Sequence, residues 1–439
     1  MKYTDAMDYI AQIQVLGIVP GLASITQLCR RIGDPQDTLQ FVHVAGTNGK
    51  GSVIAYLSTI LTAAGYRVGR YISPTIFAYR ERIQVNGRDI SQKAFGEGME
   101  VIRAACQDMT GQGLPHPTPF EVETALAFWY FREKKCDIVV LETGMGGLYD
   151  ATNLIRNTQV AVLASISMDH MQYLGGRLAD IAAHKAGILK EGRPAVSALQ
   201  PPEAMEVIRR VAQEKDCALR VADPAACKHI RRGTGNRLGR QLFDYCGADG
   251  VCMKDLEISL AGSFQTENAL VAIEAVRELR AQGYVISENA LRKGLRETVW
   301  PGRFQVLRRK PLFVVDGAHN EDAAKKLAES VEFYFTNKRI IYIMGMLRDK
   351  EYEKVIAHTH AYADQIITLT PPGNPRALSA YELAQAVAKV HPNVTAVDSP
   401  EEAVEMARLL AGPQDVILAF GSLSFLGDLI RIVERQTTW

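Results

Sequence analysis

The chain has 439 residues, more than a single hydrophobic core normally accommodates, so we expect two or three domains. Hydrophobic residues make up 47% and charged residues 23% of the composition, which is typical of a globular protein and excludes a disordered one. Fifty Lys and Arg residues are balanced by 49 Asp and Glu residues. This balance gives no electrostatic reason to expect nucleic acid or an anionic membrane as a partner.

The N-terminus and the cysteines indicate where the protein acts. The first ten residues lack the basic and apolar regions of a secretory signal, and no apolar stretch reaches the roughly 18 residues of a membrane span. The seven cysteines are scattered without a C-x-x-C pair, so neither a zinc site nor a disulfide framework is predicted. We therefore expect a cytoplasmic protein with no membrane partner, acting as a monomer.

In the first 300 residues, short apolar runs rich in β-branched residues alternate with stretches of helical periodicity. The expected strands are 41–45, 68–72, 138–141 and 160–165, and the expected helices include 52–64 and 120–131. Such alternation predicts a parallel sheet covered by helices on both faces. Asn86-Gly87 predicts the turn of a hairpin over residues 82–90, and further hairpins are expected near the sheet edge at 228–255.

A second alternation begins after Trp300-Pro301-Gly302. Its expected strands, separated by amphipathic helices, are 312–315, 340–344, 365–369, 394–397 and 416–420. This stretch spans about 140 residues, near the common size of a domain. The predicted fold class is therefore α/β, with a parallel-sheet domain over residues 1–298, whose first strand leads into the candidate P-loop described next, and a smaller doubly wound α/β domain over residues 299–439.

A candidate phosphate-binding loop follows the first expected strand. It reads Gly46-Thr47-Asn48-Gly49-Lys50-Gly51-Ser52 and leads into a helix. Glycines let backbone N–H groups converge on phosphate oxygens, the helix N-terminus adds partial positive charge, and Lys50 adds a full charge. The strict Walker A pattern would have a glycine where this chain has Val44, so the loop is a shortened variant. The alternative is a glycine-rich turn that binds nothing.

Polar side chains follow other expected strands, where ligands bind in open α/β sheets. Glu142 follows strand 138–141 and suits a Mg²⁺ ligand of the Walker B type, although it could instead cap the next turn. Ser73 and His170 follow strands 68–72 and 160–165. On their own, a Ser-Pro pair is more often only a turn, and an isolated histidine is more often structural.

Taken in chain order, these motifs resemble the Mur ligase superfamily, and specifically the folylpolyglutamate synthase/dihydrofolate synthase family. The resemblance covers the segments 43–52, 71–87, 118–128, 141–153, 167–192, 264–269, 301–305 and 316–320. It implies an ATP-dependent ligase that adds L-glutamate to a folate or dihydropteroate carboxylate through an acyl phosphate, releasing ADP and phosphate. Only 45 residues precede Gly46. This favours the folate branch over Mur ligases that carry an additional N-terminal domain.

The resemblance also implies a set of cofactors. These are ATP and two Mg²⁺ ions, with room for a monovalent cation, and the implied metal ligands are Ser73, Glu142 and His170. It further implies that CO₂ carbamylates Lys185, which by pattern alone is an ordinary helix lysine in solvent. Family members usually carry Glu where this chain has His184. The implied catalytic residues are Lys50, Lys185, His170 and Arg303.

Substrate and nucleotide contacts come from the same resemblance. Thr118-Pro119-Phe120-Glu121 would face the pteroate group, although Thr118 and Glu121 also have the spacing of a capping box. The implied nucleotide-contacting residues outside the phosphate loop are Gln265, Asn268, Arg303, Asp316, His319 and Asn320. For Gln265 and Asn268 the alternative is ordinary helix capping. The basic residues Arg231, Arg232, Arg237 and Arg240 are interpreted as a solvated hairpin without a role.

Three functions are compared. The leading one is the folate ligase, with a folate or dihydropteroate and L-glutamate as partners. The second is another Mur ligase, acting on a peptidoglycan precursor or an amino-acid polymer. The third, a P-loop ATPase used as a switch or transporter engine, is disfavoured because the motifs continue into the second domain. Dihydropteroate and tetrahydrofolate both remain open as the acceptor.

Overall fold

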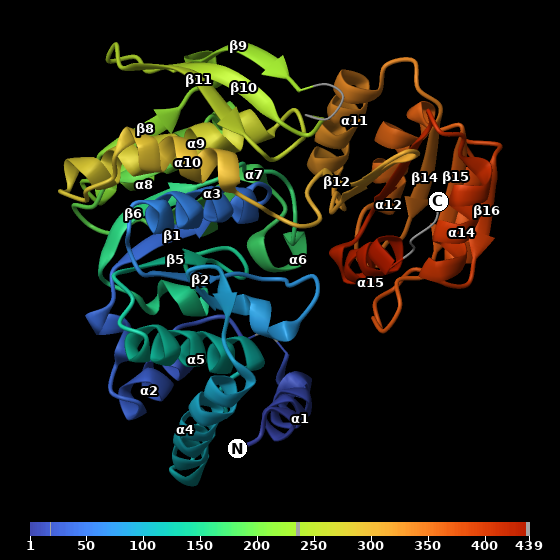
Figure 1. The fold of residues 1–439 in the computed structure, drawn as a ribbon. Helices are drawn as coiled ribbons and strands as arrows, with labels where there is room; N and C mark the ends of the chain where they lie inside the picture. The colour runs from blue at the N-terminus through green and yellow to red at the C-terminus, as the bar shows by residue number, and fades with distance from the viewer. Residues whose placement is uncertain (18, 234–237, 436–439) are drawn as a thin grey trace. The chain divides into compact units, whose positions relative to one another are not determined.

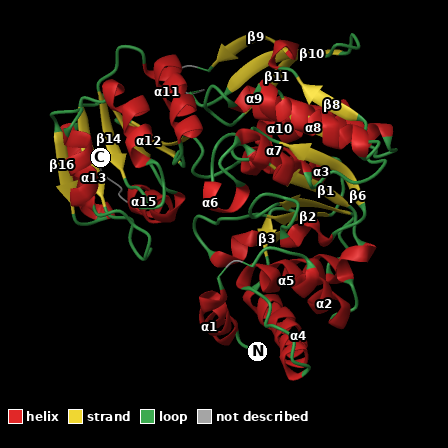
Figure 2. Ribbon diagram, turned by 180° about the vertical axis from the view of Figure 1, so that it is seen from behind, coloured by secondary structure: helices red, strands yellow, loops and turns green. Residues whose placement is uncertain are grey.

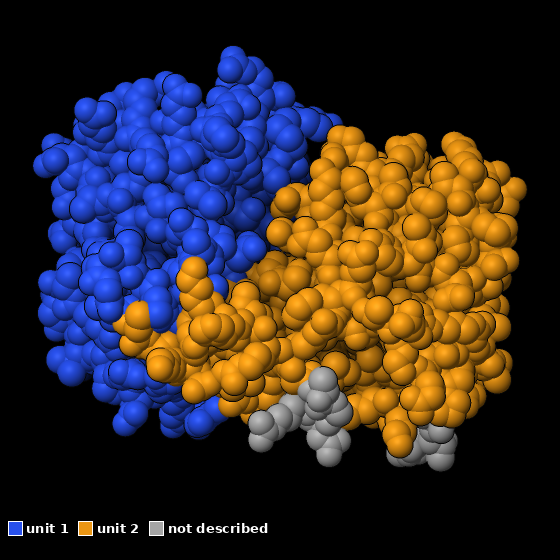
Figure 3. Space-filling view, turned by 90° about the horizontal axis from the view of Figure 1, so that it is seen from above, with its two compact units in different colours: residues 1–227, 245–251, 267–298 blue, residues 228–244, 252–266, 299–439 orange. Residues whose placement is uncertain are grey.

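The computed structural model describes residues 1–17, 19–233 and 238–435. Its contacts define two compact units (Figure 3), coloured blue and orange. Unit 1 comprises residues 1–227, 245–251 and 267–298, and unit 2 comprises residues 228–244, 252–266 and 299–439. Residues 228–244 and 252–266 thus pack with unit 2 although they precede residue 299 in the chain.

Unit 1 is built on an eight-stranded sheet with the order β4-β3-β2-β5-β1-β6-β7-β8. Neighbouring strands from β2 to β8 are parallel, whereas β3 and β4 form an antiparallel hairpin at one edge. The central strands are buried at every position, which explains their continuous apolar sequence. The strands are β1 (Phe41–Ala45), β2 (Val68–Tyr71), β3 (Ile83–Val85), β4 (Arg88–Asp89), β5 (Ile138–Glu142), β6 (Thr158–Leu163), β7 (Ala195–Ala198) and β8 (Leu219–Ala222).

Helices cover both faces of this sheet, with α5 on one side and α3 on the other (Figures 1 and 2). On the α5 side, Phe41 of β1 and Tyr71 of β2 share a buried apolar cluster with Phe128. The helices associated with unit 1 are α1 (Tyr3–Ile13), α2 (Ala23–Arg31), α3 (Lys50–Ala63), α4 (Gln92–Gly111), α5 (Pro119–Glu133), α6 (Met171–Leu174), α7 (Leu178–Ala186), α8 (Pro202–Glu214), α9 (Gln265–Ala281) and α10 (Glu288–Glu297).

Unit 2 contains a six-stranded sheet with the order β12-β13-β17-β14-β15-β16. Only β12 runs antiparallel to its neighbour. The strands are β12 (Gln305–Arg309), β13 (Leu312–Asp316), β14 (Ile340–Met344), β15 (Gln365–Leu369), β16 (Val394–Val397) and β17 (Val416–Phe420). The helices are α11 (Glu321–Phe335), α12 (Tyr352–Thr359), α13 (Ala380–Ala388), α14 (Pro400–Leu410) and α15 (Leu423–Arg435). Among the described residues, no helix combines the length and apolar character needed to cross a membrane.

The strands expected from the sequence in both halves are confirmed to within two residues at each end. The hairpin around Asn86-Gly87 is also confirmed, and both residues have the positive φ that this turn needs. The strands β7, β8 and β12 were not expected. Short 3₁₀ turns complete the chain at η1 (Gln14–Leu16), η2 (Pro35–Thr38), η3 (Tyr79–Arg82), η4 (Ala151–Leu154), η5 (Pro224–Ala226) and η7 (His360–Tyr362).

The hairpin strands expected over residues 228–255 are confirmed, and they form a separate three-stranded sheet. This sheet has the order β11-β10-β9, with β9 (Cys227–Arg232), β10 (Gln241–Cys246) and β11 (Cys252–Ile258). Alternate residues of β10 are buried, and the hydroxyl of Tyr245 donates to Glu274 of α9 at 2.7 Å. One face of the strand is therefore buried, as its alternating pattern indicates, and Tyr245 on that face contacts a helix.

This sheet also contains a disulfide and basic residues expected on a hairpin. Cys246 and Cys252 are disulfide-bonded, so the expectation of no disulfide is wrong. They flank a turn in which Gly247 N–H donates to the Val251 carbonyl at 2.9 Å, and this turn brings the two cysteines together. Of the basic run, Arg231 and Arg240 are exposed and paired with Asp255 and Glu257. Arg237 lies outside the described residues.

Candidate active site

The phosphate loop lies between β1 and α3, as its sequence predicts. Gly49 is the N-cap of α3 and has a φ of 83°, a left-handed conformation that favours glycine. A Cβ atom at Gly49 would lie 2.4 Å from the side-chain oxygen of Asn268. The loop therefore approaches the first turns of α9 so closely that only glycine fits, and Asn268 lies directly against it.

The first half of the loop is tied to the segment after β6. The N–H groups of Thr47 and Asn48 donate to the Ser165 carbonyl at 2.7 and 3.2 Å, and the Thr47 hydroxyl donates to the Ser167 carbonyl at 3.0 Å. The Asn48 side chain donates to the Ser167 hydroxyl at 3.4 Å. With this half anchored, the N-terminus of α3 supplies the anion-binding end, because the first N–H groups of a helix have no carbonyl partner within it.

Lys50 folds back over the loop towards an acidic side chain. Its ammonium group donates to the carbonyls of Gly46 and Thr47 at 3.1 and 3.3 Å, and it lies 3.9 Å from a carboxylate oxygen of Glu142. Glu142 ends β5, the strand beside β1. The structure thus brings together the cation and the acid that the sequence predicts for a nucleotide–metal site.

Ser73 joins Glu142 at the same edge of the sheet. The strands β2 and β5 are parallel, with Tyr71 opposite Leu141, so the residues that follow them are neighbours. The Ser73 N–H donates to the second carboxylate oxygen of Glu142 at 2.9 Å. The carboxylate of Glu142 and the hydroxyl that Ser73 carries are the oxygen donors that Mg²⁺ prefers, so these two residue types fit the metal that the resemblance implies.

His170, the third implied metal ligand, stands at the start of α6. Its side chain is 46% exposed, and its Nε2 atom lies 3.9 Å from Asp169. In the part of the chain that the structure describes, no three His, Cys, Asp or Glu side chains are grouped as metal ligands.

Lys185 is buried, with only 4% of its surface exposed, so the pattern-based expectation of a solvent-facing lysine is wrong. Its amine donates at 2.8 Å to the Gly46 carbonyl, the same oxygen that Lys50 contacts. Burial lowers the pKa of Lys185 to about 7, the nearby charge of Lys50 adds to this, and Asp169 and Asp150 oppose it. A lysine in this setting holds a large share of neutral amine at physiological pH, which is the form that reacts with CO₂.

The burial of Lys185 results from the way α7 packs on the glycine-rich loop after Glu142. A Cβ atom at Gly147 would lie 2.8 Å from the His184 carbonyl, and one at Gly187 would lie 2.5 Å from the Leu148 side chain. The Leu148 N–H donates to the His184 carbonyl at 2.8 Å. His184, which stands where the family has Glu, points its ring towards Tyr149 with 6.0 Å between ring centroids.

The segment 118–121 has a complete local role. Thr118 is the N-cap of α5 and Glu121 completes the capping box. The Glu121 carboxylate accepts from the Thr118 N–H and hydroxyl at 2.7 and 2.8 Å and from the Ile25 N–H at 3.1 Å. Pro119 occupies the first turn, and Phe120 packs so closely on Gly144 that a Cβ there would lie 2.5 Å from its ring. Contact of this segment with an acceptor stays a prediction.

Unit 2 gathers its predicted residues at the carboxyl end of β13. The buried Asp316 carboxylate accepts from the N–H groups of Phe304 and Ala318, each at 2.8 Å. Burial raises the pKa of Asp316, and the positive charge of Arg303 is the strongest opposing influence. His319 Nδ1 lies 2.7 Å from the Gly317 carbonyl, and the Asn320 side chain caps α11. Arg303 and Asp316 are therefore neighbours at this end of the strand.

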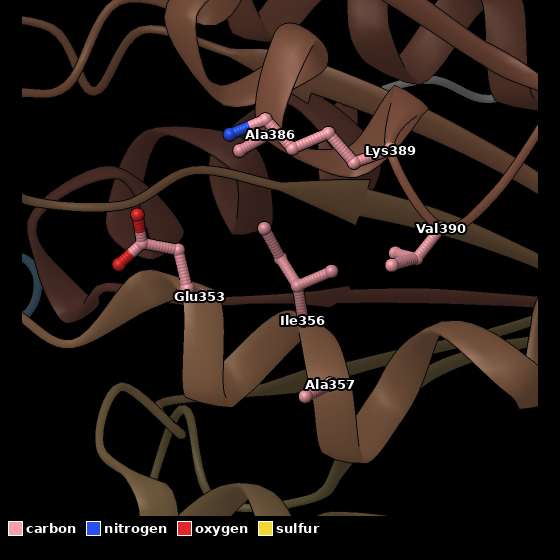
Figure 4. A pocket seen from close by; sticks show the side chains of 6 residues that line it. All are labelled: Glu353, Ile356, Ala357, Ala386, Lys389 and Val390. Atoms are coloured by element: carbon pink, nitrogen blue, oxygen red, sulfur yellow. The ribbon is translucent and has the colours of Figure 1, made fainter.

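A small hollow elsewhere in unit 2 lies apart from these residues (Figure 4). It is lined by α12, by the end of α13 and by the residues that follow α13, and its side chains are Glu353, Ile356, Ala357, Ala386, Lys389 and Val390. None of them is a predicted site residue, so this hollow is no candidate for the active site.

Sequence reasoning missed two acids that act on Lys185. Asp169 and Asp150 are close enough for their charges to raise the pKa of Lys185 against the effect of burial. Asp150 opens the run Asp150-Ala151-Thr152-Asn153 directly after the glycine-rich loop. A run containing three polar residues directly after a glycine-rich loop is the feature of the sequence that could have indicated an acid near the site.

Known protein families and sequences match both halves of the chain. The Mur ligase middle domain family matches residues 44–276, and the Mur ligase glutamate ligase domain family matches residues 302–423. The dihydrofolate synthase/folylpolyglutamate synthase of Bacillus subtilis is 35% identical, over 97% of this chain and 98% of its own length. That of Escherichia coli is 32% identical, over 98% and 95%.

Solved structures give the same result. A Mycobacterium tuberculosis folylpolyglutamate synthase complexed with ADP superposes with a TM-score of 0.89 at 30% identity, covering 99% of this chain and 100% of that one. E. coli FolC in complex with DHPP and ADP superposes with a TM-score of 0.87 at 30% identity, covering 100% and 99%.

Proposed function

The chain belongs to the folylpolyglutamate synthase/dihydrofolate synthase family of Mur ligases, and from this premise we propose how its residues ligate glutamate to a folate. It is an ATP-dependent ligase. One observation carries the assignment of the site: Lys50 and Lys185 both donate to the Gly46 carbonyl, and Lys50 lies 3.9 Å from Glu142. The phosphate loop, the acid Glu142 and Lys185, whose pKa is lowered, thus lie together around the Gly46 carbonyl. Such a combination is typical of a phosphoryl-transfer site.

The proposed reaction has two steps and no covalent protein intermediate. An oxygen of the acceptor carboxylate attacks the γ-phosphorus of ATP, and the bond from this phosphorus to the β–γ bridging oxygen breaks. ADP departs, and the acceptor now carries an acyl phosphate. The amine of glutamate then attacks the acyl carbon, the bond to the phosphate oxygen breaks, and the nitrogen loses a proton. The products are an amide, phosphate and ADP.

The roles of the residues follow from charge. The N–H groups at the start of α3 and the Lys50 side chain are proposed to hold the β- and γ-phosphates and to stabilise the charge that spreads over the phosphoryl oxygens. Asn268, which lies against Gly49, and Gln265 in the same helix are proposed to contact ATP. From unit 2, Arg303 is proposed to contact the phosphates, and Asp316, His319 and Asn320 the nucleotide or the incoming amino acid.

Ser73, Glu142 and His170 are proposed to hold magnesium. When bound, Mg²⁺ would neutralise charge on the transferred phosphoryl group. A carbamate on Lys185 would add a carboxylate beside this group. The acids near Lys185 favour its charged form, but burial and the charge of Lys50 outweigh them, so the amine remains reactive. The oxygen donors of Ser73 and Glu142 support the proposal, whereas the imidazole of His170 is an unusual ligand for this ion.

We propose that the enzyme accepts both dihydropteroate and tetrahydrofolate. The support comes from the relatives of B. subtilis and E. coli, whose names include both activities and which match almost the whole chain. A solved structure of E. coli FolC with DHPP and ADP adds support for the first acceptor.

Offering each acceptor separately with ATP and labelled glutamate is expected to give labelled product in both cases. A reaction without ATP serves as the blank. Transfer to tetrahydrofolate alone would refute the dual specificity and leave the ligase assignment standing. Transfer to neither acceptor would refute the ligase assignment itself.

A further inference from the structure

A row of buried polar side chains lies beneath the loop that follows Glu142. His43, the one polar residue of β1, is fully buried, and its Nε2 atom lies 2.9 Å from the Thr152 hydroxyl. That hydroxyl donates to the Asp150 carboxylate at 2.6 Å. Asp150 also accepts from the N–H groups of Thr152 and Met145, at 3.0 and 2.8 Å. The three side chains form a continuous path from the central strand to the loop.

The hydrogen-bond directions along this path follow from counting protons. Burial raises the pKa of Asp150, but the hydrogen bonds from Thr152, Met145 and Gly144 oppose this effect. Because the N–H groups and the hydroxyl that converge on the carboxylate are all donors, we take Asp150 as ionised and therefore as an acceptor only. Thr152 has a single hydroxyl proton and gives it to Asp150, so its oxygen must accept from His43. His43 therefore carries its proton on Nε2. Its Nδ1 atom is buried without a hydrogen-bond partner. An unprotonated Nδ1 costs less free energy in this position than a protonated one, because the N–H of a protonated Nδ1 would be a buried donor without an acceptor.

The protonation state of His43 agrees with this arrangement. Full burial lowers the pKa of His43 well below its ordinary value, and the charge of Lys190 acts in the same direction. The ring is therefore neutral throughout the physiological range. This leaves His43 as a fixed hydrogen-bond donor and not as an acid or base.

The Asp150 end of the path determines the shape of the loop. By accepting from Met145 and Thr152, the carboxylate closes residues 145–152 into a ring-like turn that begins three residues after Glu142. The same turn packs against α7, where Leu148 N–H donates to the His184 carbonyl next to Lys185. A shift of Asp150 would therefore move the loop that joins Glu142 to the helix bearing Lys185.

We propose that His43 is a positioning residue which, as a neutral Nε2–H donor to Thr152, orients Asp150 and thereby holds the loop between Glu142 and α7. The inference rests on the proposed function, since it assigns Glu142 and Lys185 to the active site. It explains why an imidazole occupies a strand whose other residues are all apolar. His43 touches no reacting atom in this account and acts only through Thr152.

The protonation of His43 is tested without any enzymatic reaction. In ¹⁵N spectra of the protein labelled at histidine, His43 is expected to show a protonated Nε2 and a bare Nδ1, unchanged between about pH 5.5 and pH 8.5. The His43→Gln variant identifies its signals. A ring protonated on Nδ1, or one that titrates in this range, would overturn the proposal, and this result does not depend on whether the ligase assignment is right.

The positioning role is tested by paired variants with tetrahydrofolate, ATP and glutamate. His43→Met removes the donor at similar size and is expected to lower kcat/KM and the apparent Mg²⁺ affinity by about 10–100-fold, the usual effect of losing an outer-shell partner. His43→Gln can still donate to Thr152 and is expected to recover at least half of the loss on a logarithmic scale. Thr152→Val is expected to match His43→Met, and the double variant to be no worse than either single variant.

Three outcomes would overturn the positioning role. These are full activity of both His43→Met and Thr152→Val, an equal loss in His43→Gln and His43→Met, and additive losses in the double variant. Thermal unfolding of each variant is measured in parallel, and Thr152→Val carries the test if His43→Met does not fold. An inactive wild-type protein would refute the proposed function and would leave the spectroscopic result standing.

Discussion

Replacing Lys50 with Ala is expected to abolish ligation, with kcat lowered by at least about 10³-fold, as befits the loss of the main phosphate-neutralising charge. The Lys50 ammonium lies on the loop carbonyls and 3.9 Å from Glu142, where it can follow the phosphoryl group during transfer. Its removal also takes away a charge that helps to lower the pKa of Lys185. The variant should therefore lose ATP affinity and turnover together, measured by calorimetry and by release of phosphate.

Lys93→Ala is the matched control for this variant. Lys93 lies on α4, is 86% exposed and pairs with Glu97 one helical turn away, so its loss should leave kcat and ATP affinity unchanged. Substantial turnover by Lys50→Ala, with the control equally active, would contradict the role of the phosphate loop. Both variants should unfold at temperatures close to that of the wild type, because neither removes a buried apolar group.

Replacing Lys185 with Ala is expected to lower kcat by at least about 10²-fold, because the variant cannot form a carbamate beside the transferred phosphate. In the wild type the amine nitrogen bonds to the carbon of CO₂ and releases one proton. With ¹³C-labelled bicarbonate, the wild type is expected to show a carbamate signal in its ¹³C spectrum that Lys185→Ala lacks. Lys190→Ala is the control, since burial also lowers the pKa of Lys190, to about 8.

The pH dependence of this signal follows from the pKa of Lys185. Only the neutral amine reacts with CO₂, and its pKa is about 7 because of burial and the charge of Lys50, opposed by Asp169 and Asp150. Carbamate and activity should therefore be low below about pH 6 and rise to a plateau above about pH 8. A carbamate signal that survives in Lys185→Ala and vanishes in Lys190→Ala would place the carbamate on Lys190 and contradict the role proposed for Lys185. Equal activity with and without CO₂ would remove it from the mechanism.

The sheets were largely predictable from the sequence because their central strands are buried on both faces. A continuous apolar run such as 41–45 or 340–344 has few other stable conformations between helical stretches. The strand β7 lacks this signal, since Ala195–Ala198 contains mostly small residues. The separate β9–β11 sheet could not be placed, because an alternating pattern shows that one face is buried but does not show which element covers it.

The site was predictable only in part, for a similar reason. Lys50, Glu142 and Ser73 follow strands, so the topology of a parallel sheet brings them to one edge. The environment of Lys185 depends on how α7 packs against the glycine-rich loop, and this contact cannot be predicted from the sequence around Lys185 alone. His43 looked like part of an apolar strand, and its partners Thr152 and Asp150 lie more than 100 residues away along the chain.

The most direct test of the proposed chemistry follows an oxygen atom. The acceptor is labelled with ¹⁸O in the carboxylate that receives glutamate, and the phosphate released during ligation is analysed by mass spectrometry. An acyl phosphate formed at the Lys50–Glu142–Lys185 site transfers one labelled oxygen to each phosphate, in equal number with the amide bonds formed. Phosphate without label, released while amide bonds accumulate, would contradict the account.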